Sequence, residues 1–259
     1  MPRFAANLTM LYNEVDFLDR FEAAAKSGFK GVEYLFPYAW PKEELAGKLQ
    51  RHGLVQVLHN LPAGDWAKGE RGIACHPDRV GEFQDGVGKA VDYAKALGCR
   101  QLNCLAGIAP QHVPADALRE TLVANLRFAA AKLDEAGIRL LIEPINTFDI
   151  PGFYLNRTRQ ALDLLDEVGS GNLYLQYDIY HMQRMEGELA NTIRQNLGRI
   201  AHLQLADNPG RNEPGTGEIN YPFLFALIDR LGYEGWIGCE YKPAATTVEG
   251  LAWVAPYLA

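Results

Sequence analysis

The chain has 259 residues, of which 48% are hydrophobic, and a formal net charge of −7 at pH 7. This length and composition suit a single α/β domain over residues 1–259, and no second domain is needed. The acidic balance argues against a general nucleic-acid or anionic-membrane binder, so we expect a small-molecule partner.

Cysteine usage and the first residues indicate a cytoplasmic protein. The chain opens with a strand-like run rather than a signal sequence, and no apolar run approaches the ~18 residues that cross a bilayer. No cysteine pair has CxxC spacing, so we expect reduced cysteines that fill the core: Cys75, Cys99, Cys104 and Cys239.

Short β-rich runs alternate with helical patterns along the whole chain. The expected strands are 4–8, 31–36, 54–60, 101–105, 138–143, 173–178, 200–205 and 236–240. The expected helices are 16–26, 42–52, 78–97, 116–135, 158–168, 188–197, 221–231 and 247–254, the first four followed by the glycines 28, 53, 98 and 137. Eight strand–helix units predict a closed (β/α)8 barrel, the TIM barrel fold.

Two loops are expected at the face of this barrel that carries active sites. Residues 61–77 follow the third strand and contain Trp66, which could cover the mouth. Residues 211–220 contain a glycine-rich turn that could close over a substrate.

Four polar residues end four consecutive expected strands: Glu143, Asp178, Gln204 and Glu240. A single glutamate in such a place is usually a solvated loop residue, but four in register would converge at one mouth of a parallel barrel. Three carboxylates brought together this way repel one another unless a cation or protons neutralise them. Oxygen ligands favour one Mg²⁺ or Mn²⁺ ion over zinc.

The phrases around these residues resemble those of the hydroxypyruvate isomerase family, which belongs to the xylose-isomerase-like barrels. They are 143–146 (EPIN), 177–181 (YDIYH), 202–207 (HLQLAD), 213–221 (EPGTGEINY) and 238–243 (GCEYKP). The resemblance implies one divalent metal held by the four strand-end residues, with Glu143 and Glu240 also transferring protons. It further implies interconversion of hydroxypyruvate and 2-hydroxy-3-oxopropanoate (tartronate semialdehyde) through an enediolate.

Four further residues are candidates for substrate binding. By resemblance to related ketose epimerases, His181 and Arg211 occupy positions that contact substrate oxygens. Lys242 lies two residues after Glu240, so strand alternation would aim it to the same side, although a solvated rim charge is an equal alternative. His59 ends the third strand and could equally be a buried structural histidine.

Three more polar residues near the expected mouth are not interpreted as metal ligands. Glu33 is expected in a hydrogen-bond network inside the barrel, and His202 in packing or in a hydrogen bond behind the ligands. Asp207 follows the seventh strand on the opposite face by parity or lies in the loop.

Other functions remain open. The nearest is isomerisation of 2-oxo-tetronate, for which a related group has similar ligands and a similar 238–243 phrase, but segments 60–66, 143–152 and 177–187 favour the shorter substrate. A non-catalytic acid-binding barrel is a distant alternative. An apurinic endonuclease of the same superfamily would use many histidine ligands and a basic surface, which six histidines and a charge of −7 do not favour. A homo-oligomer is expected on general grounds only.

Overall fold

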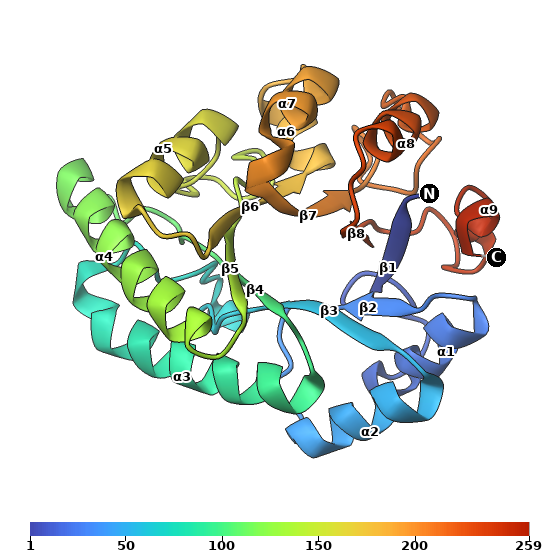
Figure 1. Ribbon diagram of the computed structural model, residues 1–259, viewed down its shortest axis with the longest axis horizontal. Helices are drawn as coiled ribbons and strands as arrows, with labels where there is room; N and C mark the ends of the chain where they lie inside the picture. Colours follow the sequence, from blue (N-terminus) through green and yellow to red (C-terminus); the bar gives the residue numbers. More distant parts are fainter. Residues whose placement is uncertain (259) are drawn as a thin grey trace.

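The computed structural model describes residues 1–258 and contains a closed barrel of eight parallel strands (Figure 1). Each strand pairs with its neighbours in sequence, and β1 pairs with β8 to close the ring. The strands are β1 (Arg3–Asn7), β2 (Gly31–Glu33), β3 (Val55–Asn60), β4 (Gln101–Cys104), β5 (Arg139–Ile142), β6 (Leu173–Asp178), β7 (Ile200–Leu205) and β8 (Trp236–Cys239). The expected TIM barrel is therefore confirmed.

Helices surround the strands as an outer ring (Figure 1). They are α1 (Arg20–Lys26), α2 (Lys42–His52), α3 (Val80–Leu97), α4 (Ala115–Asp134), α5 (Thr158–Val168), α6 (Ile179–Met185), α7 (Leu189–Asn196), α8 (Tyr221–Arg230) and α9 (Ala255–Leu258). Short 3-10 turns are η1 (Phe17–Asp19), η2 (Trp66–Lys68), η3 (Pro77–Arg79), η4 (Leu197–Arg199) and η5 (Glu249–Leu251). Gly53 and Gly98 end α2 and α3 at φ of 64° and 65°, which an L side chain adopts only with strain.

Two segments differ from the sequence-based expectation. Helix α6 was not expected, because its seven residues directly follow β6 without a separating turn signal. The expected helix 247–254 is instead η5 followed by α9. Thr247 is hydrogen-bonded to a residue far away in the sequence, since its Oγ1 accepts the N–H of Tyr12 at 2.7 Å. This tertiary contact outweighs the helical pattern.

The barrel strands carry both a small apolar cluster and a set of buried polar groups. Ala5, Val57, Leu58, Leu141 and Ala201 are buried and pack together. Buried polar groups from several strands occupy the rest of the interior, among them Asn7, Glu33, Asn103, Gln176, His202 and Gln204. Polar groups buried at this depth must bond to one another, and they do so beneath the mouth of the barrel.

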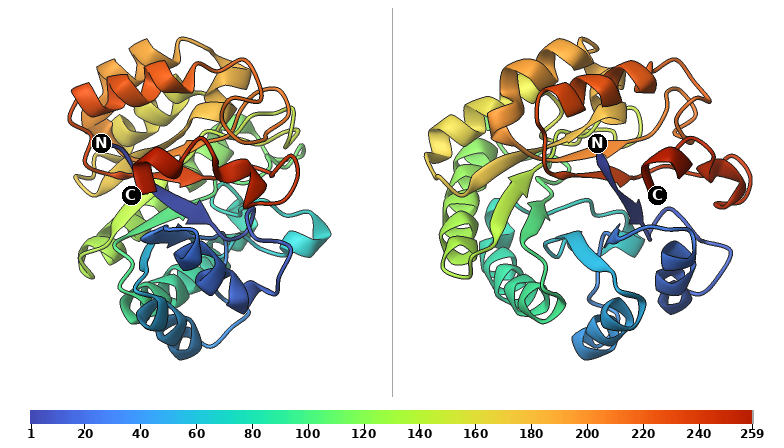
Figure 2. Two further views of the ribbon diagram at one scale, coloured as in Figure 1. Left: turned by 90° about the vertical axis from the view of Figure 1, so that its right-hand side faces the viewer. Right: turned by 45° about the vertical axis from the view of Figure 1, so that its right-hand side comes forward.

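The two ends of the described chain meet at the closure of the barrel. They lie near each other in all three ribbon views (Figures 1 and 2). Phe4 of β1 packs edge-on against Tyr257 of α9 and Trp253, with ring centroids 5.2 Å apart in each case. Closure of the barrel therefore depends on residues from opposite ends of the sequence.

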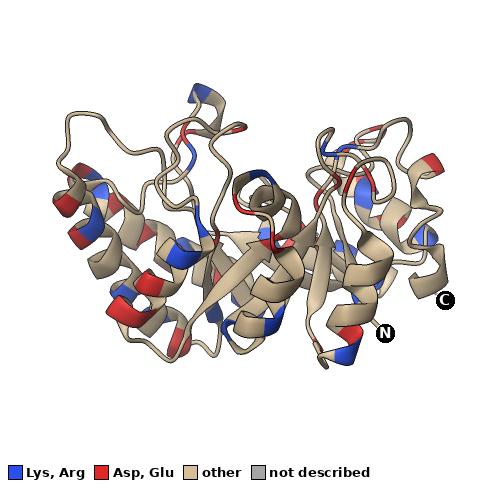
Figure 3. Ribbon diagram, turned by 90° about the horizontal axis from the view of Figure 1, so that it is seen from above, with Lys and Arg blue, Asp and Glu red and all other residues tan. Residues whose placement is uncertain are grey.

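The outer surface carries charges of both signs. Figure 3 shows basic and acidic residues interspersed on the outer helices. Within residues 1–258, no helix combines the length and apolar character that a membrane span requires.

Candidate functional site

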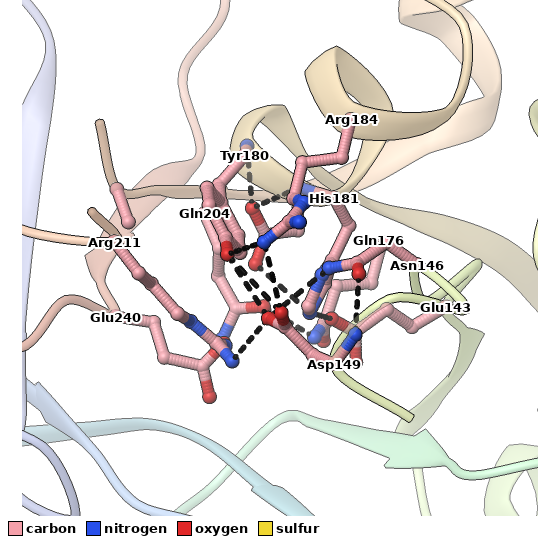
Figure 4. Close-up of polar contacts among 12 residues, drawn as sticks. Glu143, Asn146, Asp149, Gln176, Tyr180, His181, Arg184, Gln204, Arg211 and Glu240 are labelled. Atoms are coloured by element: carbon pink, nitrogen blue, oxygen red, sulfur yellow. Dashed lines mark hydrogen bonds and ion pairs between the residues drawn. The ribbon is translucent and has the colours of Figure 1, made fainter. Parts of the chain in front are cut away.

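A buried cluster of ionisable groups lies at the carboxyl ends of the strands. Glu143 follows β5, Asp178 ends β6, His181 lies in the first turn of α6 and Glu240 follows β8. One potential ligand atom from each lies within 4.8 Å of the others. The three carboxylates predicted from strand ends are therefore brought together, and Figure 4 shows how side chains from separate elements converge there.

The two carboxylate oxygens of Asp178 differ in their hydrogen bonds. Its Oδ1 accepts the N–H groups of Tyr180 at 2.8 Å and His181 at 3.3 Å, which caps α6. Its Oδ2 is fully buried and has no hydrogen-bond partner within residues 1–258. A buried, unpartnered carboxylate oxygen among other carboxylates is what a cation ligand requires, so the residues fit a divalent ion.

The two glutamates face the same cluster from the ends of β5 and β8, which are three strands apart in the ring. Glu143 Oε2 accepts a hydrogen bond from Asn103 Nδ2 at 2.9 Å, and Glu240 Oε2 accepts one from Arg211 Nη2 at 3.3 Å. Burial, followed by the charges of Glu240 and Asp178, raises the pKa of Glu143 well above its usual value. Burial raises the pKa of Glu240 to about 8, although Arg211 opposes the shift. Each carboxyl can therefore hold a proton near neutral pH when no cation is bound.

Gln204 on β7 has a defined amide orientation. Its Nε2 donates to Glu33 Oε1 at 2.8 Å, and its Oε1 accepts from Gln176 Nε2 at 2.6 Å. Because Glu33 Oε1 also accepts from Asn7 Nδ2, it is an acceptor and requires the nitrogen of Gln204 on its side. The oxygen then faces the cavity that Gln204 lines with Glu143 and Glu240.

Glu33 belongs to a polar layer inside the barrel, as expected. Its Oε2 lies 2.7 Å from His202 Nε2, and its Oε1 also accepts from Asn7 Nδ2 at 3.0 Å. Gly238 makes room for it, since a Cβ there would lie 2.2 Å from Glu33 Oε1. His202 therefore contacts the group behind Gln204 and not the carboxylate cluster.

Arg211 reaches the cluster from the loop after β7. Its guanidinium lies 3.3 Å from Glu240, 3.4 Å from Asp149 and 5.1 Å above the ring of Tyr180. Burial lowers the pKa of Arg211, but the carboxylates around it outweigh that effect and raise it. A guanidinium held in this way can bind a carboxylate at the mouth.

The structure does not bring Lys242 or His59 to the cluster. Lys242 is exposed, and since β8 ends at Cys239, strand alternation does not extend to it. His59 is buried with Nδ1 3.4 Å from the hydroxyl of Tyr38, whereas the next residue, Asn60, lines the cavity. Burial lowers the pKa of His59 to about 4, which fits the structural alternative.

Asp207 organises the loop that carries Arg211. Its carboxylate accepts backbone N–H groups from four loop residues, at 2.8 to 3.1 Å: Asn208, Gly215, Gly217 and Ile219. Asp207 therefore lies in the loop and supports it.

In the other expected mouth loop, Trp66 packs edge-on against Phe36, and its ring centroid lies 4.1 Å from the guanidinium carbon of Arg71.

Sequence reasoning assigned no role to several polar residues around the cluster: Asn103, Asn146, Asp149, Gln176, Tyr180 and Arg184. Asp149 accepts from Arg184 Nη1 at 3.0 Å and from the hydroxyl of Tyr180 at 3.1 Å (Figure 4). Asn146 and Asp149 follow a strand end closely, which was an available signal. Their partners come from other elements and were not readable from the chain.

A larger hollow lies at the opposite, amino-terminal end of the strands. It is lined by Arg3, Arg100 and Arg139 among other residues, and these three arginines are exposed. It holds no convergent carboxylates and lies away from the cluster, so the chemistry belongs to the smaller cavity at the carboxyl end.

A closed parallel barrel with a carboxylate cluster at its carboxyl mouth defines the class of protein. The model of the xylose isomerase-like TIM barrel family matches residues 21–257, and the chain belongs to this family. Hydroxypyruvate isomerase of Escherichia coli K12 is 60% identical over 99% of this chain and 100% of its own length. The 2-oxo-tetronate isomerase of Cupriavidus necator is 48% identical over 100% and 99%. Within the family, the chain thus groups with isomerases.

A solved structure is also similar over the whole chain. It is described as an AP endonuclease, family 2, from Brucella melitensis, with 47% identity, a TM-score of 0.97 and coverage of 99% of both chains. The fold of that protein is thus nearly the same, while its description differs from those of the isomerases.

Proposed function

We propose that this protein interconverts hydroxypyruvate and 2-hydroxy-3-oxopropanoate, with Glu143 and Glu240 as the proton-transferring pair. The observation that carries the proposal is the pairing of two buried carboxyls with raised pKa values across one small cavity. The identity of 60% with a hydroxypyruvate isomerase supports the choice of substrate.

The reaction needs an acid and a base on two adjacent carbons. One glutamate removes a proton from C3 of hydroxypyruvate, which produces an enediolate, and the other delivers a proton to C2. The hydroxyl proton on O3 passes to O2, so the carbonyl moves from C2 to C3 and no atoms are gained or lost. In the reverse direction the two glutamates exchange the roles of acid and base, and each positioned transfer contributes about 10²- to 10⁴-fold.

A divalent cation fits the oxygen groups of the cluster. Glu143, Asp178, Gln204 and Glu240 would hold it, and the all-oxygen donor set favours Mg²⁺ or Mn²⁺. When bound, such an ion supplies Lewis-acid polarisation of the carbonyl and relieves the repulsion among the three carboxylates.

The substrate carboxylate requires a cationic partner, and Arg211 supplies it in this proposal. Its guanidinium already lies against two carboxylates, so it can exchange one of these contacts for a substrate carboxylate. His181 is placed to contact a substrate oxygen, because its Nε2 lies 3.6 Å from Asp178 and 3.9 Å from Glu143.

The second candidate substrate is 2-oxo-tetronate, which is longer by one carbon. The 48% identity with a 2-oxo-tetronate isomerase over the whole chain favours this candidate next. Both substrates undergo the same proton transfers, so the site chemistry does not separate them.

Abasic DNA is a weaker candidate. The relative described as an AP endonuclease raises it, but the charge of this chain is −7, and the exposed arginines that line one hollow, Arg3, Arg100 and Arg139, lie at the amino-terminal end of the strands, away from the carboxylate cluster. Acidic and basic residues are interspersed on the outer helices (Figure 3). A polyanion would gain little counterion-release energy on such a surface.

The test is a side-by-side assay of the purified protein on hydroxypyruvate, 2-oxo-tetronate and an abasic DNA duplex. Each is assayed after EDTA treatment and again after addition of Mg²⁺ or Mn²⁺, and deuterium uptake from solvent is followed on the two acids. We expect metal-dependent isomerisation and deuterium uptake, fastest with hydroxypyruvate. Binding of either acid without deuterium uptake would indicate a non-catalytic acid-binding barrel and refute the proposal.

A further inference from the structure

We propose that Asn146, in the loop after β5, is a positioning residue that keeps the proton of the His181 ring on Nε2. This nitrogen then donates a hydrogen bond into the site and does not bind the metal ion. The inference deepens the proposed function and rests on it for the contact between His181 and substrate.

The orientation of the Asn146 amide follows from its own hydrogen bonds. Its Oδ1 accepts the backbone N–H groups of Phe148 at 3.1 Å and Asp149 at 2.8 Å. Its Nδ2 faces Asp149 Oδ2 at 3.2 Å and His181 Nδ1 at 2.6 Å (Figure 4). Turning the amide over would set its NH₂ against two N–H donors and its oxygen against a carboxylate, so only one orientation is satisfied.

The protonation of His181 follows in turn. A ring nitrogen 2.6 Å from an amide NH₂ must accept, so Nδ1 carries no proton. An imidazolium would set an N–H group against that NH₂ and is excluded by the same contact. The neutral ring therefore has its proton on Nε2.

The protonated nitrogen points toward the carboxylates. Nε2 lies 3.6 Å from Asp178 Oδ2 and 3.9 Å from Glu143 Oε1, and both distances are longer than a hydrogen bond. The N–H group is thus left for an oxygen that enters between them. A nitrogen that carries a proton has no lone pair to offer, so His181 is not a metal ligand although it lies in the cluster.

Asp149 contacts both Asn146 and Arg211 and so helps to orient Arg211 as well. One carboxylate accepts from Asn146 Nδ2 and also pairs with Arg211 Nη1 at 3.4 Å. The two groups proposed to contact substrate, His181 and Arg211, are therefore oriented through one side chain. Arg184 Nη1 lies 3.0 Å from Asp149 and helps to hold it.

The first experiment reads the tautomer directly. In protein labelled with ¹⁵N-histidine, two-bond ¹H–¹⁵N correlation spectra distinguish protonated from unprotonated ring nitrogens for each of the six histidines. The His181 signals are identified by their loss in His181→Gln. We expect Nε2 protonated and Nδ1 unprotonated, both with EDTA and with saturating Mg²⁺. A proton on Nδ1 in the Mg²⁺-loaded protein, or on both nitrogens, would overturn the inference.

The second experiment reverses the contact. Asn146→Asp replaces a hydrogen-bond donor by an acceptor, which requires the proton on Nδ1 of His181. We therefore expect the tautomer of His181 to change. We also expect kcat to fall about 10²- to 10³-fold, as it does when a preorganised hydrogen-bond donor is removed from an active site. Asn146→Ala removes the donor without imposing the opposite tautomer, so its loss should be smaller. A changed tautomer with wild-type kcat would refute the positioning role.

A charge control accompanies this variant. Asn146→Asp combined with Asp149→Asn restores the net charge but keeps an acceptor against Nδ1, and Asp149→Asn alone gives the cost of that second change. We expect the double variant to stay at least about 10-fold below Asp149→Asn. Equal activity of the two would show that charge, and not the tautomer, matters. If Asn146→Asp does not fold, the wild-type spectrum still tests the tautomer assignment, and Asn146→Ala still tests the positioning role.

The two proposals fail in different ways. A protein with the proton on Nε2 but no isomerase activity on either acid would refute the proposed function and leave the tautomer assignment standing. An active isomerase with the proton on Nδ1 would refute only the role of Asn146.

Discussion

Residues at the mouth of the barrel differ in what holds them. Asp178 is fixed by two backbone N–H groups of its own helix, whereas Glu143 and Glu240 are held by side chains from other elements. Asp178 therefore suits a ligand role, while the glutamates retain the freedom to exchange protons. This difference in support is the basis of the following substitutions.

Replacing Glu240 by glutamine tests the pair of proton-transferring groups. Glu240→Gln should reduce kcat by at least about 10²-fold, because an amide cannot carry the proton. Glu135→Gln, at the exposed residue directly after α4, is the matched control and should keep full activity. Thermal unfolding should show that both variants fold. Wild-type turnover in Glu240→Gln would refute the two-glutamate scheme.

Glu33 accepts a hydrogen bond from Gln204, a proposed metal ligand, so its replacement should weaken metal binding. Glu33→Gln frees the amide of Gln204 to rotate, and we expect the Kd for Mn²⁺, measured by calorimetry, to rise about 10- to 100-fold. Gly238→Ala displaces Glu33 without changing the charge and should act in the same direction. An unchanged Kd in both variants would contradict this coupling.

At the scale of elements, most strands and helices were predictable from hydrophobic periodicity. Helices α2 and α5 and strands β6 and β7 have the expected bounds, since turn residues or caps delimit each of them. Helix α6 was overlooked because its cap, Asp178, is also the last residue of a strand. The prediction of a final helix at 247–254 was wrong, because hydrogen bonds between Thr247 and a distant part of the chain outweigh the helical periodicity of this segment.

The loop after β7 gives a prediction at this scale. Asp207→Ala removes the acceptor of four backbone N–H groups in the loop that carries Arg211. We expect a loss of about 1–3 kcal/mol in the free energy of unfolding for the unsatisfied groups, and a rise in KM larger than the fall in kcat. Thr216→Ala, exposed on the same loop, loses only its bond to the carbonyl of Glu213 and should change neither.

At the scale of the whole molecule, the cluster should make stability depend on pH and metal together. Glu143 and Glu240 have folded-state pKa values above their usual 4.5, so in the metal-free protein their contribution is fully present below about pH 4.5. It is lost as pH rises through the folded value, about 8 for Glu240, because the folded state must then bury repelling charges. A cation bound by the ionised carboxylates reverses this loss.

The measurement is the difference in Tm between Mg²⁺- or Mn²⁺-loaded and EDTA-treated protein from pH 5 to 9. We expect the difference to grow with pH across this window, since protons compete with the metal for the same oxygens. The same series on Glu240→Gln should show a weaker rise. A difference that is constant with pH would argue against a metal at these carboxylates.

We propose that residues 1–259 form one domain, because β1 and β8 must pair to close the barrel. A single transition in calorimetric unfolding is the expected result. Homo-oligomerisation stays a prediction that sedimentation velocity can test.

The amino-acid sequence by itself determined the barrel and the four strand-end ligand candidates, because strand period, helix period and chain order are local and parallel strands bring their ends to one mouth. The tertiary structure decided the rest. It brought Asn146 and Asp149 into contact with His181 and Arg211. Substrate binding by Lys242 and His59 stays a prediction. The contacts of Asn146 and Asp149 join residues 35 and 62 positions apart, and their hydrogen-bond direction depends on packing that no local pattern encodes.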